Sequence, residues 1–254
     1  MVHKLKLSLW LIPVLFFTGC INNQVNPNIA QIDQQALTLR NHIYEISGDD
    51  GYYQNENIDF ALIKRVKDSV GENLKNILVA YNDQKLEYDI YQEGLDKSIS
   101  LMYFCWIEQA DAARRNNDLE NLNFIREEES DFSRQEAIQK WIDENEKGEY
   151  YEKIENYFSL VPELISKGSE IDANNQKLNE LKTQAEGLQV DGNIVEYNLV
   201  ADEYNALLEQ NNQMIDEYNT QLEEIDYENV FNNFMKFIDV SYIFPGQDTI
   251  PLAK

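Results

Sequence analysis

The sequence contains few of the residues from which disulfide frameworks, metal sites and tight turns are built. Of its 254 residues, two are cysteine, two are histidine, ten are glycine and five are proline. Two cysteines exclude a disulfide framework. Two histidines are too few for zinc sites built from His and Cys, and they disfavour triads that use His. The low glycine and proline content favours long helices.

Basic clusters and nucleotide-binding motifs are missing as well. The chain has 21 Lys and Arg against 46 Asp and Glu, which gives a formal charge of −25. Binding to nucleic acid is therefore strongly disfavoured. There is no phosphate loop, Rossmann glycine run, nucleophile elbow or zincin motif, so we expect no cofactor, no metal site and no catalytic residues. We interpret the excess acid as a solvated surface, with attraction to cations or to a basic partner as the alternative.

The first twenty residues, MVHKLKLSLWLIPVLFFTGC, have the layout of a secretory signal. Lys4 and Lys6 precede an apolar run from Leu7 to Phe17, which is shorter than the roughly 20 residues of a membrane-spanning helix. Phe17-Thr18-Gly19-Cys20 closes the run with small residues and a cysteine. These four residues resemble the lipobox of bacterial and archaeal lipoproteins, with Phe17 in place of the usual leucine.

The resemblance implies that residues 1–19 are a signal peptide and that Cys20 is lipid-modified and becomes the mature N-terminus. It also implies a diacylglyceryl group, and two acyl chains hold a protein on a membrane where one is marginal. We therefore expect a lipid anchor on the outer face of a membrane, followed by a tether over residues 20–28. Ile21 in place of Asp favours the outer membrane if the host has two. An uncleaved anchor and a cleaved signal with a chance cysteine are the alternatives.

Residues 29–165 carry apolar side chains at spacings of three and four, which predicts a bundle of amphipathic helices. One stripe covers 29–46. A second covers 63–110, with a turn at 82–83 or at Gly94. Around residues 99–107 apolar side chains occur on every side, so we expect this helix at the centre of the core.

Capping boxes predict three further helix starts, at Asn117, Ser133 and Asn193. In each, a side-chain acceptor is followed three residues later by Glu. Gly148 is expected to separate two helices, and Pro162 to mark a helix start or a kink.

A seven-residue repeat organises residues 169–226. Glu-Tyr-Asn recurs at 196–198, 203–205 and 217–219, and Gln-Asn-Asn at 210–212 fills the remaining slot. If the tyrosines are heptad position a, apolar residues fill d and e on this arm, and positions a and d of residues 171–188 are mainly apolar. The turn at 190–193 then predicts an antiparallel coiled-coil hairpin. The broad stripe of its second arm suggests packing on a third helix, either within the chain or between chains.

The predicted organisation is thus an all-α chain with a signal peptide, a tether and three further parts. They are a helical bundle over 29–165, the hairpin with a short apolar helix over 166–238, and an extended tail over 239–254.

Carboxylates are the only plentiful chemistry. Asp49, Asp50, Glu56 and Asp59 cluster around the first loop, and Glu108 and Asp111 can share a helix face. Such pairs can serve glycan hydrolysis or hold calcium, but in so acidic a chain most pairs are solvated. Cys105 is expected to be a buried thiol, and His42 a structural residue. The tyrosines of the hairpin suit core filling, with sugar stacking as the alternative.

The function we expect is non-enzymatic: binding or structure at the cell envelope, with an envelope protein or polymer as partner. The alternative is an extracytoplasmic enzyme that acts on a glycan through paired carboxylates. A solute-binding lipoprotein ranks last, because the sequence shows almost no strand pattern.

Overall fold

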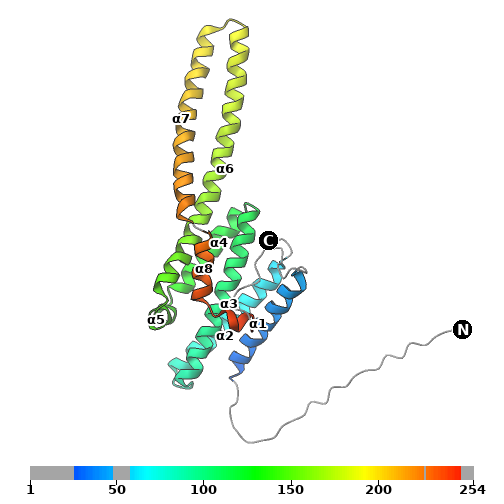
Figure 1. Ribbon diagram of the computed structural model, residues 1–254, viewed down its shortest axis with the longest axis vertical. Coiled ribbons are helices and arrows are strands. Elements are labelled where there is room, and N and C mark those ends of the chain that lie inside the picture. The colour runs from blue at the N-terminus through cyan, green and yellow to red at the C-terminus, as the bar shows by residue number, and fades with distance from the viewer. Residues whose placement is uncertain (1–25, 48–57, 226, 247–254) are drawn as a thin grey trace, which may run out of the picture.

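The computed structural model describes residues 26–47, 58–225 and 227–246. Within these ranges the protein is a bundle of nine helices without strands, which confirms the all-α class (Figure 1). The helices are α1 Pro27–Ile46, α2 Phe60–Asn82, α3 Tyr88–Arg115, α4 Leu119–Ser133, α5 Glu136–Glu144, α6 Gly148–Val190, α7 Ile194–Glu224, α8 Tyr227–Phe237 and α9 Val240–Ile243.

Helix α1 begins earlier than the sequence indicated. Pro27 occupies the first turn, where its missing N–H costs nothing, and the Asn26 side chain accepts a hydrogen bond of 2.9 Å from the Asn28 N–H. The last two residues of the predicted tether are therefore helical, and residues 20–25 lie outside the described residues. The predicted stripe is the buried face of the helix, from Ile29 to Ile43.

Helix α3 is the centre of the body, as predicted. Tyr103, Phe104 and Cys105 are consecutive and fully buried, so the helix is covered on every side by its neighbours. Of the two predicted turns, the one at 82–83 is present and the one at Gly94 is not. Gly94 lies inside α3, where a Cβ atom would approach Ile77 Cδ1 of α2 to 2.6 Å. The glycine therefore serves the close approach of two helices.

Two of the predicted helix starts are wrong in detail. The N-cap of α4 is Asp118 rather than Asn117, and its side chain accepts from the Asn121 N–H at 3.2 Å. Ser133 does not begin a helix. It is the last residue of α4, because the neighbouring Phe132 is buried and extends the helix by a further turn. The third start is confirmed, since Asn193 caps α7 at the Glu196 N–H.

Helix α6 crosses the predicted boundary between the bundle and the hairpin at residue 165. It begins at Gly148, as expected, and continues through Pro162 to Val190. A proline inside a helix removes one hydrogen bond. The helix nevertheless continues, because Phe158, Val161 and Leu164 on both sides of Pro162 are buried against the body.

Beyond the body, α6 and α7 form the predicted antiparallel hairpin (Figure 1). Gly192 supplies the positive φ of +71° that the turn requires. Leu178, Leu181 and Val200 are buried between the two helices, outside the main core. At 1.5 Å per residue, the part of α6 beyond residue 165 extends about 36 Å. Among the described residues, the second arm packs against the body at its base, through Tyr218.

The extended tail predicted from residue 239 is wrong for the residues that the structure describes. Val240–Ile243 is the short helix α9, which Asp239 caps through the Tyr242 N–H at 3.1 Å. Ile243 and Phe244 are fully buried, and the Arg40 guanidinium of α1 donates to the Ile243 carbonyl at 2.5 Å. These contacts outweigh the turn signal of the prolines that follow. Residues 247–254 lie outside the described residues.

Candidate functional site

Three of the four acidic residues around the first loop, Asp49, Asp50 and Glu56, lie outside the described residues, as does Cys20. Asp59 is the N-cap of α2, where its side chain accepts from the Leu62 N–H at 3.0 Å. The Asp59 N–H in turn donates to His42 Nε2 at 3.0 Å. Asp59 and His42 therefore have structural roles at the start of α2.

The second acidic pair is not an open site either. Asp111 is paired with Arg114 at 2.7 Å and with Arg115 at 3.0 Å, both on its own helix. Glu108 is only 4% exposed. Glu108 is therefore buried in the body, whereas Asp111 is partly exposed and paired with two arginines.

Cys105 is fully buried, as expected. Burial raises the pKa of its thiol to about 12, because the thiolate would have to form away from water. The thiol is thus protonated and inert at neutral pH.

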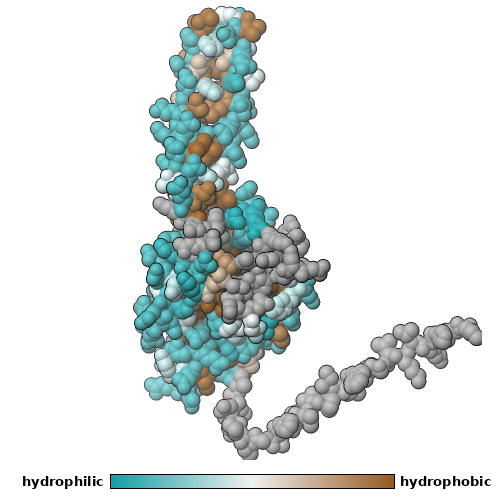
Figure 2. All heavy atoms as spheres, viewed as in Figure 1, coloured by the Kyte–Doolittle hydropathy of each residue, from teal (hydrophilic) through white to brown (hydrophobic). Residues whose placement is uncertain are grey.

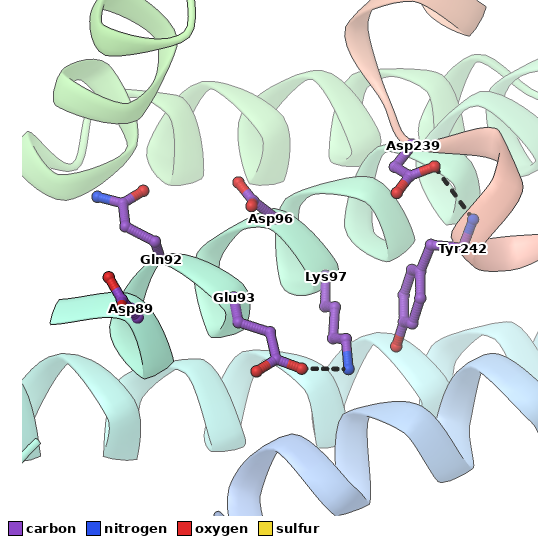
Figure 3. Close-up of a pocket in the computed structure, with 7 residues that line it drawn as sticks. All are labelled: Asp89, Gln92, Glu93, Asp96, Lys97, Asp239 and Tyr242. Carbon is purple, nitrogen blue, oxygen red and sulfur yellow. Dashed lines mark hydrogen bonds and ion pairs between the residues drawn. The ribbon is translucent and has the colours of Figure 1, made fainter. Parts of the chain in front are cut away.

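An acidic hollow with a volume of about 370 Å³ lies between α3 and α9 (Figure 3). Lys97 crosses it and pairs with Glu93 and with Asp33 of α1, each at 2.8 Å. Burial lowers the pKa of Lys97, but these two partners outweigh it and raise the pKa. The Tyr242 hydroxyl donates to Asp33 at 3.0 Å. Burial and the neighbouring Asp33 carboxylate both raise the pKa of the Tyr242 hydroxyl. The polar groups therefore join α1, α3 and α9.

Two more of the carboxylates that line this hollow are committed to packing. Asp239 caps α9, and its own N–H donates to the Ser100 hydroxyl at 2.9 Å. Asp96 accepts from the indole N–H of Trp141 on α5. These charged side chains are therefore used in contacts that hold the helices of the bundle together.

A buried acid that the sequence analysis missed lies between α4 and α6. Glu129 is 2% exposed and accepts a hydrogen bond of 2.6 Å from the Tyr103 hydroxyl. Burial raises the pKa of its carboxyl to about 7, the hydroxyl of Tyr103 opposes the rise, and Glu155 adds to it. Glu129 borders a hollow of about 500 Å³ that Glu127, Asp131 and Glu155 also line.

A signal for Glu129 was present in the sequence. Leu122, Ile125, Glu129 and Phe132 are spaced by three and four, and all four are buried on one face of α4. A carboxylate in phase with an apolar stripe is a candidate for a perturbed pKa.

The heptad positions of the hairpin match the structure. Tyr197, Tyr204 and Tyr218 are half-buried, and Asn211, in the remaining slot of their register, is buried. The tyrosines therefore contribute to the seam between the helices, as predicted. Asn198, Asn205 and Asn219 next to them are exposed.

The tip of the hairpin carries the most exposed large apolar side chains among the described residues, and hydrophobic atoms are visible at this end in Figure 2. Val190 is 87% exposed and Val195 75%, and they lie on either side of the turn. Leu199 and Ile194 follow at 66% and 61%, and every other exposed large apolar side chain among those described is below these values. We call these four residues the tip patch.

No family model, no curated protein and no solved structure matches this chain. The described residues include no helix long and apolar enough to cross a membrane, and no cluster of His, Cys, Asp and Glu placed to hold a metal. The functional argument therefore depends on the sequence and on the geometry of the described residues.

Proposed function

We propose that the protein is lipid-anchored through Cys20 outside the cytoplasm and has a non-enzymatic binding role at the cell envelope. The observation that carries this proposal is the position of the hairpin. In Figure 1 the first turn of α1 and the turn of the hairpin lie at opposite ends of the molecule. A lipid on the segment before α1 would leave the hairpin directed away from the membrane.

The construction of the hairpin supports a role in binding. Its distal part is stabilised by one apolar seam and adds nothing to the core of the body, since Leu178, Leu181 and Val200 bury only between its two helices. Such an arm costs conformational entropy without improving the stability of the bundle. A projecting arm instead extends the reach of an anchored protein to a partner.

The anchor is tested by metabolic labelling with a radioactive fatty acid. The wild-type protein should incorporate the label and fractionate with membranes, whereas Cys20→Ser should lose both properties. Cys105→Ser is the matched control, because the buried thiol of Cys105 cannot be the site of modification. Equal labelling of wild type and Cys20→Ser would refute the anchor.

The binding role is tested by crosslinking in intact cells, followed by purification of the mature protein. We expect a defined envelope protein or polymer to be recovered with the wild type and lost with Cys20→Ser, which cannot reach the same membrane surface. Recovery of no partner from either protein would refute the binding role.

One observation favours the glycan-directed enzyme as a second candidate. A general acid needs a pKa near the working pH. Glu129 has a pKa of about 7 and borders a hollow that is lined by three further carboxylates and by two arginines, Arg126 and Arg134. Its low exposure makes it the weaker proposal. Release of reducing ends from cell-wall glycan should then be lost in Glu129→Gln and kept in Glu127→Gln, which alters an exposed neighbour.

A further inference from the structure

Three of the four residues of the tip patch occupy positions at which a coiled-coil hairpin has no use for apolar residues. In the heptad that places Tyr197 and Ala185 at a, Val190 and Val195 fall at f and Leu199 at c. Positions c and f point away from the partner helix and are ordinarily polar. Hairpin packing therefore explains Val200 at d, which is buried, but does not explain these three residues, which are exposed.

The charges around the tip patch are all of one sign. Residues 183–202 contain four acids and no lysine or arginine. Glu186 precedes Val190 by four residues, and Asp202 follows Leu199 by three, so each carboxylate shares a helix face with an apolar residue of the patch. Asp191 and Glu196 lie at the turn itself. The tip is thus apolar on the outward sides of both helices and negatively charged around them.

This charge pattern decides between the possible occupants. An anionic membrane surface repels it, and no basic side chain is present to hold lipid headgroups. The tip of a second copy carries the same four acids, so tip-to-tip pairing would bring like charges together. A protein surface with an apolar hollow rimmed by lysine or arginine can bury the apolar side chains of the tip and pair with the carboxylates around them.

We propose that the tip of the α6–α7 hairpin is a docking surface for a protein partner that has an apolar hollow surrounded by basic residues. This inference rests on the proposed function and names the chemistry of the partner. The hollow receives the end of the hairpin, with Val190 of α6 against one wall and Val195 and Leu199 of α7 against the opposite wall, and Glu186 and Asp202 face the basic rim. A patch this small buries less than a typical stable interface of about 800 Å² per partner. The contact is therefore transient unless several anchored copies engage together.

The test places a photo-reactive phenylalanine at Leu199 of the full-length protein in its host. The matched control places it at Gln213, which is exposed and occupies the same heptad position two heptads closer to the body. We expect one adduct, specific to Leu199, whose crosslinked peptide is apolar and flanked by lysine or arginine. An adduct with a second copy, an adduct with lipid, the same adducts at both positions, or none would overturn the inference.

Two variants test the chemistry of the contact with the purified partner. Val195→Asp and the charge-reversed pair Glu186→Lys with Asp202→Lys should each weaken binding roughly ten-fold or more, equivalent to about 1.4 kcal/mol. Neither variant alters the seam, so unchanged helicity is expected and is checked by circular dichroism. The mature Cys20→Ser protein should not sediment with phosphatidylglycerol vesicles, and sedimentation that needs the tip patch would contradict a protein partner.

The outcomes separate this inference from the proposed function. Crosslinks that form from the body and are unaffected by the tip variants would leave the anchored binding role intact and refute the tip patch. If Cys20→Ser remained associated with membranes to the same extent as the wild type, the anchor would be refuted, whatever the tip contacts.

Discussion

Asn211 of α7 donates a hydrogen bond of 2.9 Å from its side-chain amide to the side-chain oxygen of Asn175 on α6. Asn211 is buried, whereas Asn175 is exposed, so the pair spans the edge of the hairpin seam. A single polar residue at an a position fixes the register of a coiled coil and lowers its stability. The pair therefore accounts for the one departure from tyrosine in the repeat.

Replacing Asn211 by leucine should stabilise the hairpin by about 1 kcal/mol, because an apolar side chain then fills the seam and the exposed Asn175 is hydrated instead. Thermal unfolding followed by circular dichroism measures the change as a higher Tm. Asn212→Leu, at the exposed neighbouring position, should leave the Tm unchanged. A lower Tm for Asn211→Leu would show that the hydrogen-bonded amide of Asn211 stabilises the hairpin in addition to fixing its register.

Two helical glycines should respond to substitution in opposite directions. Gly94→Val should reduce the free energy of unfolding by about 1–3 kcal/mol, because its Cβ meets Ile77 Cδ1 at 2.6 Å in a packed interface. Gly71→Ala should increase it by about 1 kcal/mol, because nothing lies within 4 Å and alanine is the better helix former. Urea unfolding of both variants measures the difference, and a shared sign would contradict the packing of α2 on α3.

The ion pairs of the body should contribute according to their burial. Lys67 is 5% exposed, pairs with Glu128 and lies 5.9 Å from the ring centre of Trp106. Glu128→Ala leaves this ammonium buried without its carboxylate and should cost about 2–3 kcal/mol, less than for a fully buried pair because Glu128 is partly solvated. Asp68→Ala breaks the exposed Lys64–Asp68 pair, with N···O at 3.6 Å, and should cost less than about 0.5 kcal/mol. Equal losses in urea unfolding would contradict the buried placement of Lys67.

Periodic features of the sequence predicted the helices and the hairpin well, because they depend on neighbours three, four or seven residues away. The buried face of α1, the cap at Asn193 and the a positions of the tyrosines are all local in this sense. The tip patch was also visible in the sequence, since Val190 and Val195 fall at outward heptad positions. In the sequence analysis, Val190 was assigned to the turn at 190–193 and Val195 was given no role.

The features that the sequence did not predict depend on contacts between distant segments. Ser133 has the form of an N-cap, yet burial of Phe132 keeps it inside α4. Phe244 is followed by a proline and resembles a loop residue, yet it packs against Phe104 of α3 with ring centres 5.5 Å apart. Periodicity places Glu129 in phase with the apolar face of α4, but the raised pKa of its carboxyl comes from burial under the helices that cover this face.

Glu129 should make the stability of the protein depend on pH in a way opposite to most carboxylates. Its pKa is about 7 in the folded protein and 4.5 as the ordinary value for Glu, so between these pH values the folded state binds more protons than the unfolded state. The Glu129 contribution therefore favours folding below pH 4.5, is lost as the pH rises to 7, and stays lost above it. The loss is on the order of 3 kcal/mol, because one unit of pKa corresponds to about 1.4 kcal/mol.

Glu129→Gln removes this dependence while keeping an oxygen that accepts from the Tyr103 hydroxyl. The variant should be more stable than the wild type at pH 8, and the two should converge towards pH 4.5, in urea unfolding measured at both pH values. Glu127→Gln, which neutralises an exposed acid two residues away, should follow the wild-type profile and corrects for the overall charge of the chain. A difference between wild type and Glu129→Gln that does not change with pH would show that the Glu129 carboxyl ionises as an ordinary glutamate, despite its burial between α4 and α6.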